Sequence, residues 1–143
     1  MFLGQYVHSI DDKGRLTLPS KFRPALEGGL VVTLGLDPCL LVFPRATWEA
    51  WAARIEALPM TNPDARLLAR HFLANADDGQ LDRQGRVLIP AYLRSQAQLD
   101  SDVVVAGLSS RIELWSPARW QEVRAITPEQ VGKVAEHLAA LGI

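Results

Sequence analysis

The amino-acid sequence predicts a mainly β protein with peripheral helices, an α+β fold in which two pseudo-symmetric halves complete one interlaced β-barrel. The first observation is a repeat: residues 11–23 read Asp-Asp-Lys-Gly-Arg-Leu-Thr-Leu-Pro-Ser-Lys-Phe-Arg, and residues 82–94 read Asp-Arg-Gln-Gly-Arg-Val-Leu-Ile-Pro-Ala-Tyr-Leu-Arg. The second is that the same order of apolar strands, a proline and a tryptophan follows each copy. The third is size, because a half of roughly 50–60 residues buries too little surface to fold alone, and a shared barrel also removes exposed sheet edges.

Each copy of the repeat predicts a tight turn, a strand and a short helix. A glycine forms the turn, and the residues that follow it, 15–18 and 86–89, have the aliphatic or β-branched side chains that suit a half-buried strand. Pro19 and Pro90 then remove a ladder donor and end the strands. Because proline is favoured in the first turn of a helix, short helices are expected over 21–26 and 91–99.

The segments after the repeats predict two matching hairpins and four further helices. Residues 30–36 and 39–43 correspond to 103–108 and 112–115, with Gly35 matching Gly107. The helix starts are indicated by the polar residues Thr47, Asn62, Ser116 and Thr127. The chain is therefore divided into a first half (1–60), a connecting helix (61–76), a second half (77–124) and a C-terminal helix (125–143). The apolar stripe of that last helix fits packing on its own barrel or on a neighbour.

The composition is that of a globular protein, with 48% hydrophobic and 22% charged residues. No apolar run approaches the roughly 20 residues that span a bilayer, and the first residues lack the pattern of a secretory signal, so we expect a soluble, cytoplasmic protein with no membrane partner. The single cysteine, Cys39, allows no intrachain disulfide. The net charge of −1 argues against nucleic acid as a partner, but each repeated segment carries two more bases than acids.

The two Asp-x-x-x-Arg motifs, each followed by the same strand and proline, resemble the MraZ family, relatives of AbrB-type transition-state regulators. The resemblance extends over nearly the whole chain, including the Met-Phe-Leu-Gly start and the segment Pro-Cys-Leu-Leu-Val-Phe-Pro. It implies a swapped-hairpin AbrB-like β-barrel, a ring-like homo-oligomer, and binding to double-stranded promoter DNA upstream of the division and cell-wall gene cluster. It also implies association with the nucleoid.

The resemblance places the family's motif on Asp11 with Arg15 and on Asp82 with Arg86. From the residues alone, two interpretations of the motifs are equally good. In one, the motifs are rigid turns that Asp and Gly stabilise; in the other, the arginines bind a partner. With the resemblance, we expect Arg15 and Arg86 to contact guanine edges or phosphates, and Lys13 and Arg83 to contact phosphates. The turn-supporting residues are then Asp11, Gly14, Asp82 and Gly85. Lys21, Arg23 and Arg94 are further candidates for phosphate contacts.

The second copy departs from the first, with Gln84 in place of Lys13 and Ala91-Tyr92 in place of Ser20-Lys21. It is therefore expected either to contact DNA less strongly or to pack against a neighbouring subunit. The sequence then predicts that Arg15 is the centre of the stronger DNA-facing turn.

Other chemistries find little support in the sequence. His8, His71 and His137 lack metal-ligand spacing, and no nucleophile motif or phosphate loop occurs, so we expect no metal, no cofactor and no enzymatic activity. The four tryptophans fit core or subunit packing better than base stacking. The leading hypothesis is a sequence-specific transcriptional regulator that binds repeated short DNA boxes as a homo-oligomer. The alternative is an oligomeric scaffold whose charged turns bind a protein.

Overall fold

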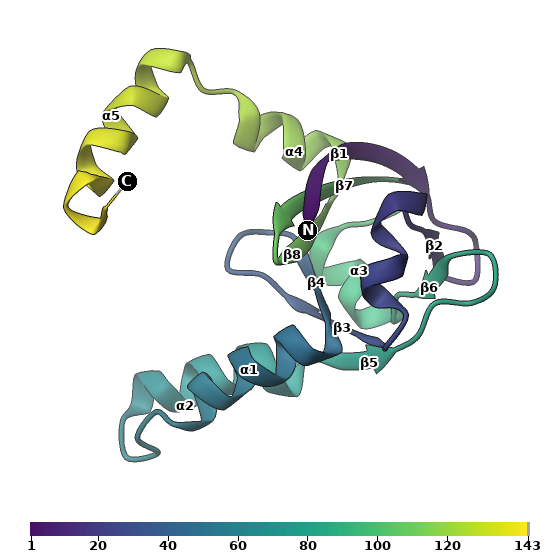
Figure 1. Ribbon diagram of the computed structural model, residues 1–143, viewed down its shortest axis with the longest axis horizontal. Helices are drawn as coiled ribbons and strands as arrows, with labels where there is room; N and C mark the ends of the chain where they lie inside the picture. Colours follow the sequence, from purple (N-terminus) through teal and green to yellow (C-terminus); the bar gives the residue numbers. More distant parts are fainter. Residues whose placement is uncertain (143) are drawn as a thin grey trace.

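A computed structural model, which describes residues 1–142, contains a six-stranded sheet, a two-stranded ribbon and helices at the periphery (Figure 1). The large sheet has the order β1-β7-β8-β4-β3-β5, and all its strand pairs are antiparallel. The ribbon pairs β2 with β6. The strands are β1 (Phe2–Ser9), β2 (Arg15–Thr17), β3 (Leu30–Leu34), β4 (Leu40–Pro44), β5 (Asp77–Gly79), β6 (Arg86–Leu88), β7 (Asp102–Ser109) and β8 (Arg111–Trp115).

The strand pairs interlace the two halves of the chain. The predicted hairpins are confirmed as β3–β4 and β7–β8, and they join through the pairing of β4 with β8. The strand that leads into the first repeat, β1, pairs along its whole length with β7 of the second half. In exchange, the strand that leads into the second repeat, β5, pairs with β3 of the first half. Neither half therefore completes its part of the sheet alone.

A closed barrel is not detected in the described residues, because the large sheet has two free ends and the ribbon is a separate hydrogen-bonded unit. The α+β class is confirmed, whereas the swapped-hairpin barrel stays a prediction. One isolated bridge, Ile10 to Leu16, links the end of β1 to the ribbon.

The core lies between the ribbon and the large sheet, and the repeats supply its centre. Leu16 and Leu18 of the first repeat, and Val87 and Ile89 of the second, are almost completely buried in one cluster with side chains of the large sheet. The aliphatic side chains of the repeat therefore anchor the ribbon to the core, while the turns before them stay at the surface.

The short elements after the two prolines differ in form. The predicted helix over 91–99 is confirmed in part as α3 (Ala91–Ala97), which ends where Gln98 takes a left-handed conformation. The equivalent segment of the first repeat forms two 3₁₀ turns, η1 (Ser20–Phe22) and η2 (Pro24–Leu26), instead of one helix. Pro24 explains this difference, because it has no N–H to continue the hydrogen bonds of a helix begun at residue 20.

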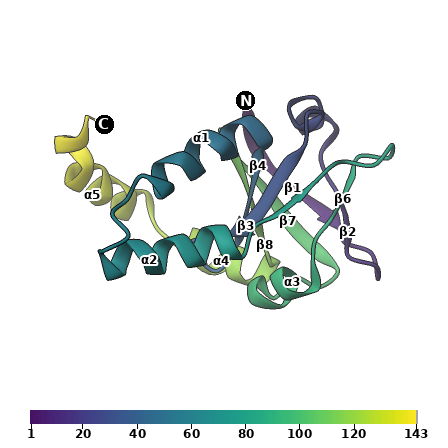
Figure 2. The ribbon, with the colours of Figure 1, turned by 90° about the horizontal axis from the view of Figure 1, so that it is seen from below.

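A helical layer projects from the side of the molecule that lies away from the ribbon (Figure 2). It consists of α1 (Arg45–Glu56), α2 (Pro63–Ala69) and one π-helical turn, η3 (Arg70–Ala74). Asn62 caps α2 as predicted, but the prediction for Thr47 is wrong: α1 begins at Arg45, directly after Pro44, and Thr47 lies within it. The aromatic side chains pack as expected, and the Trp51 and Phe72 rings lie 4.6 Å apart.

Two helices follow the second hairpin, α4 (Pro117–Arg124) and α5 (Pro128–Leu138), which continues into the 3₁₀ turn η4 (Ala139–Leu141). Ser116 caps α4, and Thr127 and Gln130 form a capping box at α5, as the sequence predicted. Figure 1 shows α5 standing apart from the sheets, and it has no buried residue. No helix among residues 1–142 is long and apolar enough to cross a membrane.

Candidate functional site

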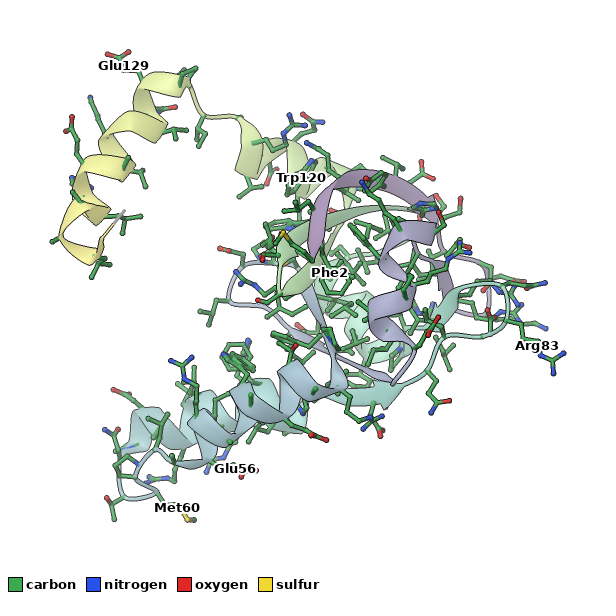
Figure 3. All side chains as sticks on the ribbon, in the orientation of Figure 1. Phe2, Glu56, Met60, Arg83, Trp120 and Glu129 are labelled. Atoms are coloured by element: carbon green, nitrogen blue, oxygen red, sulfur yellow. The ribbon has the colours of Figure 1, made fainter. Side chains whose placement is uncertain are left out.

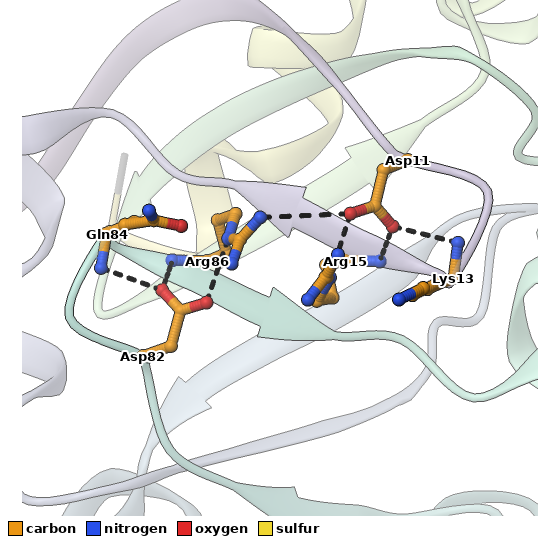
Figure 4. A network of polar contacts seen from close by, with 6 residues as sticks. All are labelled: Asp11, Lys13, Arg15, Asp82, Gln84 and Arg86. Atoms are coloured by element: carbon orange, nitrogen blue, oxygen red, sulfur yellow. Dashed lines mark hydrogen bonds and ion pairs between the residues drawn. The ribbon is translucent and has the colours of Figure 1, made fainter.

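The first Asp-x-x-x-Arg motif forms a tight turn closed by one carboxylate. Asp11 Oδ1 accepts hydrogen bonds from the backbone N–H groups of Lys13 and Arg15, both at 2.9 Å. Asp11 Oδ2 accepts from Arg15 Nε at 2.8 Å (Figure 4). A single side chain thus closes the turn and fixes the direction of the arginine that follows it.

The second motif repeats this geometry. Asp82 accepts from the backbone N–H groups of Gln84 and Arg86 at 2.9 Å, and from Arg86 Nε at 2.8 Å. The turn chemistry therefore depends on the shared Asp, Gly and Arg, and tolerates the change from Lys13 to Gln84.

The two carboxylates are stabilised in their charged form. In each, the hydrogen bond from the backbone N–H of the motif arginine is the largest cause that lowers the pKa, for Asp11 as for Asp82. Both groups lie at the surface, so they remain ionised at neutral pH and hold their arginines by charge-assisted hydrogen bonds.

The motif glycines are needed for their backbone conformation. Gly14 has φ of +83° and Gly85 has φ of +74°, in the left-handed region that side chains with a Cβ rarely adopt. The N–H of each glycine donates to the carbonyl of its motif aspartate at 3.0 Å.

The antiparallel ribbon places one turn at each of its ends and brings the two motif arginines onto the same face between them (Figure 4). Thr17 of β2 is opposite Arg86 of β6, and Arg15 is opposite Leu88. Arg86 Nη1 also lies 3.9 Å from Asp11 Oδ2, so the guanidinium of the second motif reaches the carboxylate of the first. The structure therefore combines the motif residues of both copies, 71 positions apart, in one polar network (Figure 4).

Cationic side chains surround this network. Lys13 and Arg83 are exposed, and Figure 3 shows Arg83 at the end of its turn, pointing away from the body of the molecule. Arg15 and Arg86 are half-exposed, at 35% and 27% of their side-chain surface. Lys21, a further candidate from the sequence, lies with its Nζ 4.9 Å from the centre of the Tyr6 ring.

Arg23 and Arg94 have contacts that the sequence analysis missed. Arg23 donates from Nε and Nη2 to the carbonyl of Leu18, and Arg94 donates from Nε to the carbonyl of Ile89. Both guanidinium groups are half-buried against the turns. The available signal was their equivalent position as the last residue of each repeat copy.

The arrangement presents directed cationic hydrogen-bond donors, which suit a polar or anionic acceptor. Arg15 and Arg86 use Nε to bind their own aspartates, which directs the planar guanidinium. The Nη groups of the guanidinium can then meet a further acceptor, as Arg86 Nη1 does where it lies 3.9 Å from Asp11 Oδ2. Within residues 1–142, no group of three His, Cys, Asp or Glu side chains is placed to hold a metal ion.

Comparison with known proteins places these features in a family. A family model described as "MraZ protein, putative antitoxin-like" matches residues 1–71 and again residues 72–132. A protein of Desulfitobacterium hafniense strain Y51, named transcriptional regulator MraZ, is 46% identical over 143 residues, which is the full length of both chains. A protein of Herpetosiphon aurantiacus with the same name is 48% identical over 143 residues, again the full length of both. The double match and the full-length identity show that this chain belongs to the MraZ family.

Proposed function

We propose that this chain is a sequence-specific, DNA-binding transcriptional regulator whose recognition surface is the pair of Asp-x-x-x-Arg turns. The observation that carries the proposal is that the ribbon holds both arginines, Arg15 and Arg86, on one face at one side of the molecule, with the exposed Lys13 and Arg83 in the turns that precede them (Figure 1). Relatives of the same length are named transcriptional regulators, which supports the same role here.

The proposed recognition uses the free edge of each guanidinium. An arginine fixed through Nε can donate two parallel hydrogen bonds from its Nη groups, and guanine O6 and N7 in the major groove accept such a pair. Lys13 and Arg83 are compact or flexible cations that would bind phosphates, which position the protein without reading sequence.

The two motif arginines differ in the number of carboxylates that contact them within the chain. Asp11 Oδ2 accepts from Arg15 Nε and also lies near Arg86 Nη1, so Arg86 is held by two carboxylates. Arg86 must exchange part of this ion pair for a base contact. Arg15 is therefore the principal reading residue, and Arg86 contributes less.

Assembly into a ring-like homo-oligomer completes the proposal. The helix α5 exposes apolar side chains at helical spacing, Val131, Val134 and Leu138, followed by Leu141, which fits burial against a second copy. Repetition of the turns around a ring would bind repeated short DNA boxes through avidity. We propose as the target the promoter of the chain's own division and cell-wall gene cluster, with the protein in the cytoplasm at the nucleoid. We further propose that the ribbon and the large sheet together correspond to the swapped-hairpin barrel.

The test is a fluorescence-anisotropy titration with DNA from upstream of the chain's own gene, beside a scrambled duplex. Arg15→Ala is expected to weaken binding to the promoter DNA by about 10- to 100-fold, the value of one bidentate base contact. Arg86→Ala is expected to have a smaller effect. Arg54→Ala, which removes an exposed cation of α1, is the matched control and should bind like the parent chain.

The dependence on salt separates reading from positioning. Lys13→Ala should weaken binding to both duplexes equally and reduce the slope of log affinity against log salt by about one. Arg15→Ala should instead abolish the preference for promoter DNA. Normal promoter binding by Arg15→Ala contradicts the assignment of the turn, and no binding at low salt by the parent chain favours the scaffold.

A further inference from the structure

The last arginine of each repeat, Arg23 or Arg94, contacts the turn of the other half. Arg23 donates to the carbonyl of Leu18 from Nε at 3.1 Å and from Nη2 at 2.9 Å. The N–H of the same residue, Leu18, donates to the carbonyl of Gly85 at 3.0 Å. The Arg23 guanidinium covers Gly85 and occupies the space in which a Cβ at that position would stand.

The opposite arrangement is the same with the halves exchanged. Arg94 Nε donates to the carbonyl of Ile89 at 2.9 Å, and the N–H of Ile89 donates to the carbonyl of Gly14 at 2.8 Å. A Cβ built on Gly14 would lie 3.0 Å from Cζ of Arg94. We call each of these arrangements, an arginine that covers the motif glycine of the other half, a brace. The same brace occurs in both halves although their sequences differ, so the geometry is a property of the repeat.

We propose that Arg23 and Arg94 are positioning residues, each of which holds the reading turn of the other half. Each covered glycine directly precedes a motif arginine, Gly14 before Arg15 and Gly85 before Arg86. Fixing the peptide at the glycine fixes the point from which the reading side chain extends. The inference rests on the proposed function for its effect on DNA, but its structural claim can be tested without DNA.

The contacts distinguish this role from that of a surface cation. A phosphate-binding side chain keeps its N–H donors free for the ligand. In contrast, Arg23 donates two hydrogen bonds to a backbone carbonyl, and Arg94 donates one. Both are half-buried. At Gly85 a larger residue would displace the Arg23 guanidinium from its place, whereas at Gly14 an added Cβ would require only a small shift of Arg94.

The structural claim is tested by hydrogen–deuterium exchange with mass spectrometry on the full chain. Arg94→Ala is expected to accelerate exchange by about tenfold in the peptide that contains residues 11–15 and to leave residues 82–86 unchanged. The reason is that the turn can then open locally without breaking the contacts of Arg94. Arg23→Ala should do the reverse. The two variants are controls for each other, because they remove the same side chain from equivalent positions.

The crossed pattern is the decisive result. A merely structural role would accelerate exchange in both turns together, and a local role would affect the turn of the same half; either result overturns the proposal. If an alanine variant fails to fold, Arg23→Lys and Arg94→Lys give the same crossed test, since lysine keeps the charge but cannot donate in Arg's forked geometry.

DNA affinity gives a second measurement that separates the brace from a phosphate contact. Arg94→Lys and Arg94→Ala should lose promoter affinity to a similar degree, on the order of tenfold, with an unchanged salt slope. Recovery of affinity in Arg94→Lys would show a charge contact and overturn the positioning role. A crossed exchange pattern in a chain that binds no DNA would refute the proposed function and leave the brace intact.

Discussion

Replacing the motif glycines by alanine should destabilise the protein, and more strongly at position 85 than at 14. Both residues have positive φ, which costs a residue with a Cβ about 1–2 kcal/mol. At Gly85 the new methyl group overlaps the Arg23 guanidinium, which must leave the carbonyl of Leu18, and the loss of such a hydrogen bond adds about 1 kcal/mol. At Gly14 the nearest guanidinium atoms are 3.0 Å from the added Cβ, so a small shift suffices.

The free energy of unfolding is therefore expected to fall by about 2–3 kcal/mol in Gly85→Ala and by about 1–2 kcal/mol in Gly14→Ala. Gly28→Ala is the matched control, since no atom lies within 4 Å of its added Cβ and its φ is not in the left-handed region. It should stay within about 0.5 kcal/mol of the parent chain.

The measurement is urea unfolding followed by tryptophan fluorescence at one fixed protein concentration, because stability would depend on concentration in the proposed homo-oligomer. If Gly85→Ala unfolds like Gly28→Ala, the conformational requirement at the turn is refuted. If Gly14→Ala and Gly85→Ala lose equal stability, the contribution of the Arg23 contact is refuted.

Three further predictions concern the turns, the core and the last helix. Hydrogen bonds lower the pKa values of Asp11 and Asp82 in the folded chain, so the ionised carboxylates stabilise the fold fully above their unfolded pKa values near 3.8. This stabilisation is lost as the pH falls through the lower folded pKa values. In urea unfolding, the free energy of unfolding should therefore fall more steeply with acid in the parent chain than in an Asp11→Asn/Asp82→Asn variant, and equal slopes would contradict the role of the carboxylates. Burial raises the pKa of the Cys39 thiol to about 12, so Ellman's reagent at pH 8 should label it only after unfolding, and rapid labelling of the folded chain would contradict its burial. If the chain forms the proposed homo-oligomer through α5, Leu138→Lys should reduce the particle mass in light scattering, whereas an unchanged mass would exclude this helix face as a subunit contact.

Local signals in the sequence predicted the elements well. Asn62, Ser116 and Thr127 each stand directly before a proline and cap a helix, because a side-chain acceptor and a missing N–H satisfy the first turn within a few residues. Thr47 offered the same acceptor without the proline after it, and the helix begins earlier, at Arg45, with Pro44 in the N-cap position.

The sequence predicted that the two halves interlace, but it did not predict which strands pair across them. The exchange of β1 and β5 depends on which apolar faces meet after the chain collapses, and each half carries a hairpin with buried strands of its own. The covering of a glycine by a distant arginine likewise has no local signal, since Arg94 acts on a turn 80 positions earlier in the chain. Only their repetition at the same place in each copy singles these arginines out.

Fusion of two halves in one chain allows the turns to become unequal. In a dimer of identical chains, a contact from one turn to the other would be matched by its symmetric counterpart. Here Arg86 Nη1 approaches Asp11 Oδ2 at 3.9 Å, but residues 1–142 contain no equivalent ion pair from Arg15 to Asp82. The first carboxylate therefore serves two guanidinium groups and the second serves one. Because Arg15 is restrained by one carboxylate and Arg86 by two, the proposed function assigns the principal contact with DNA to Arg15 of the first turn and a smaller one to Arg86 of the second.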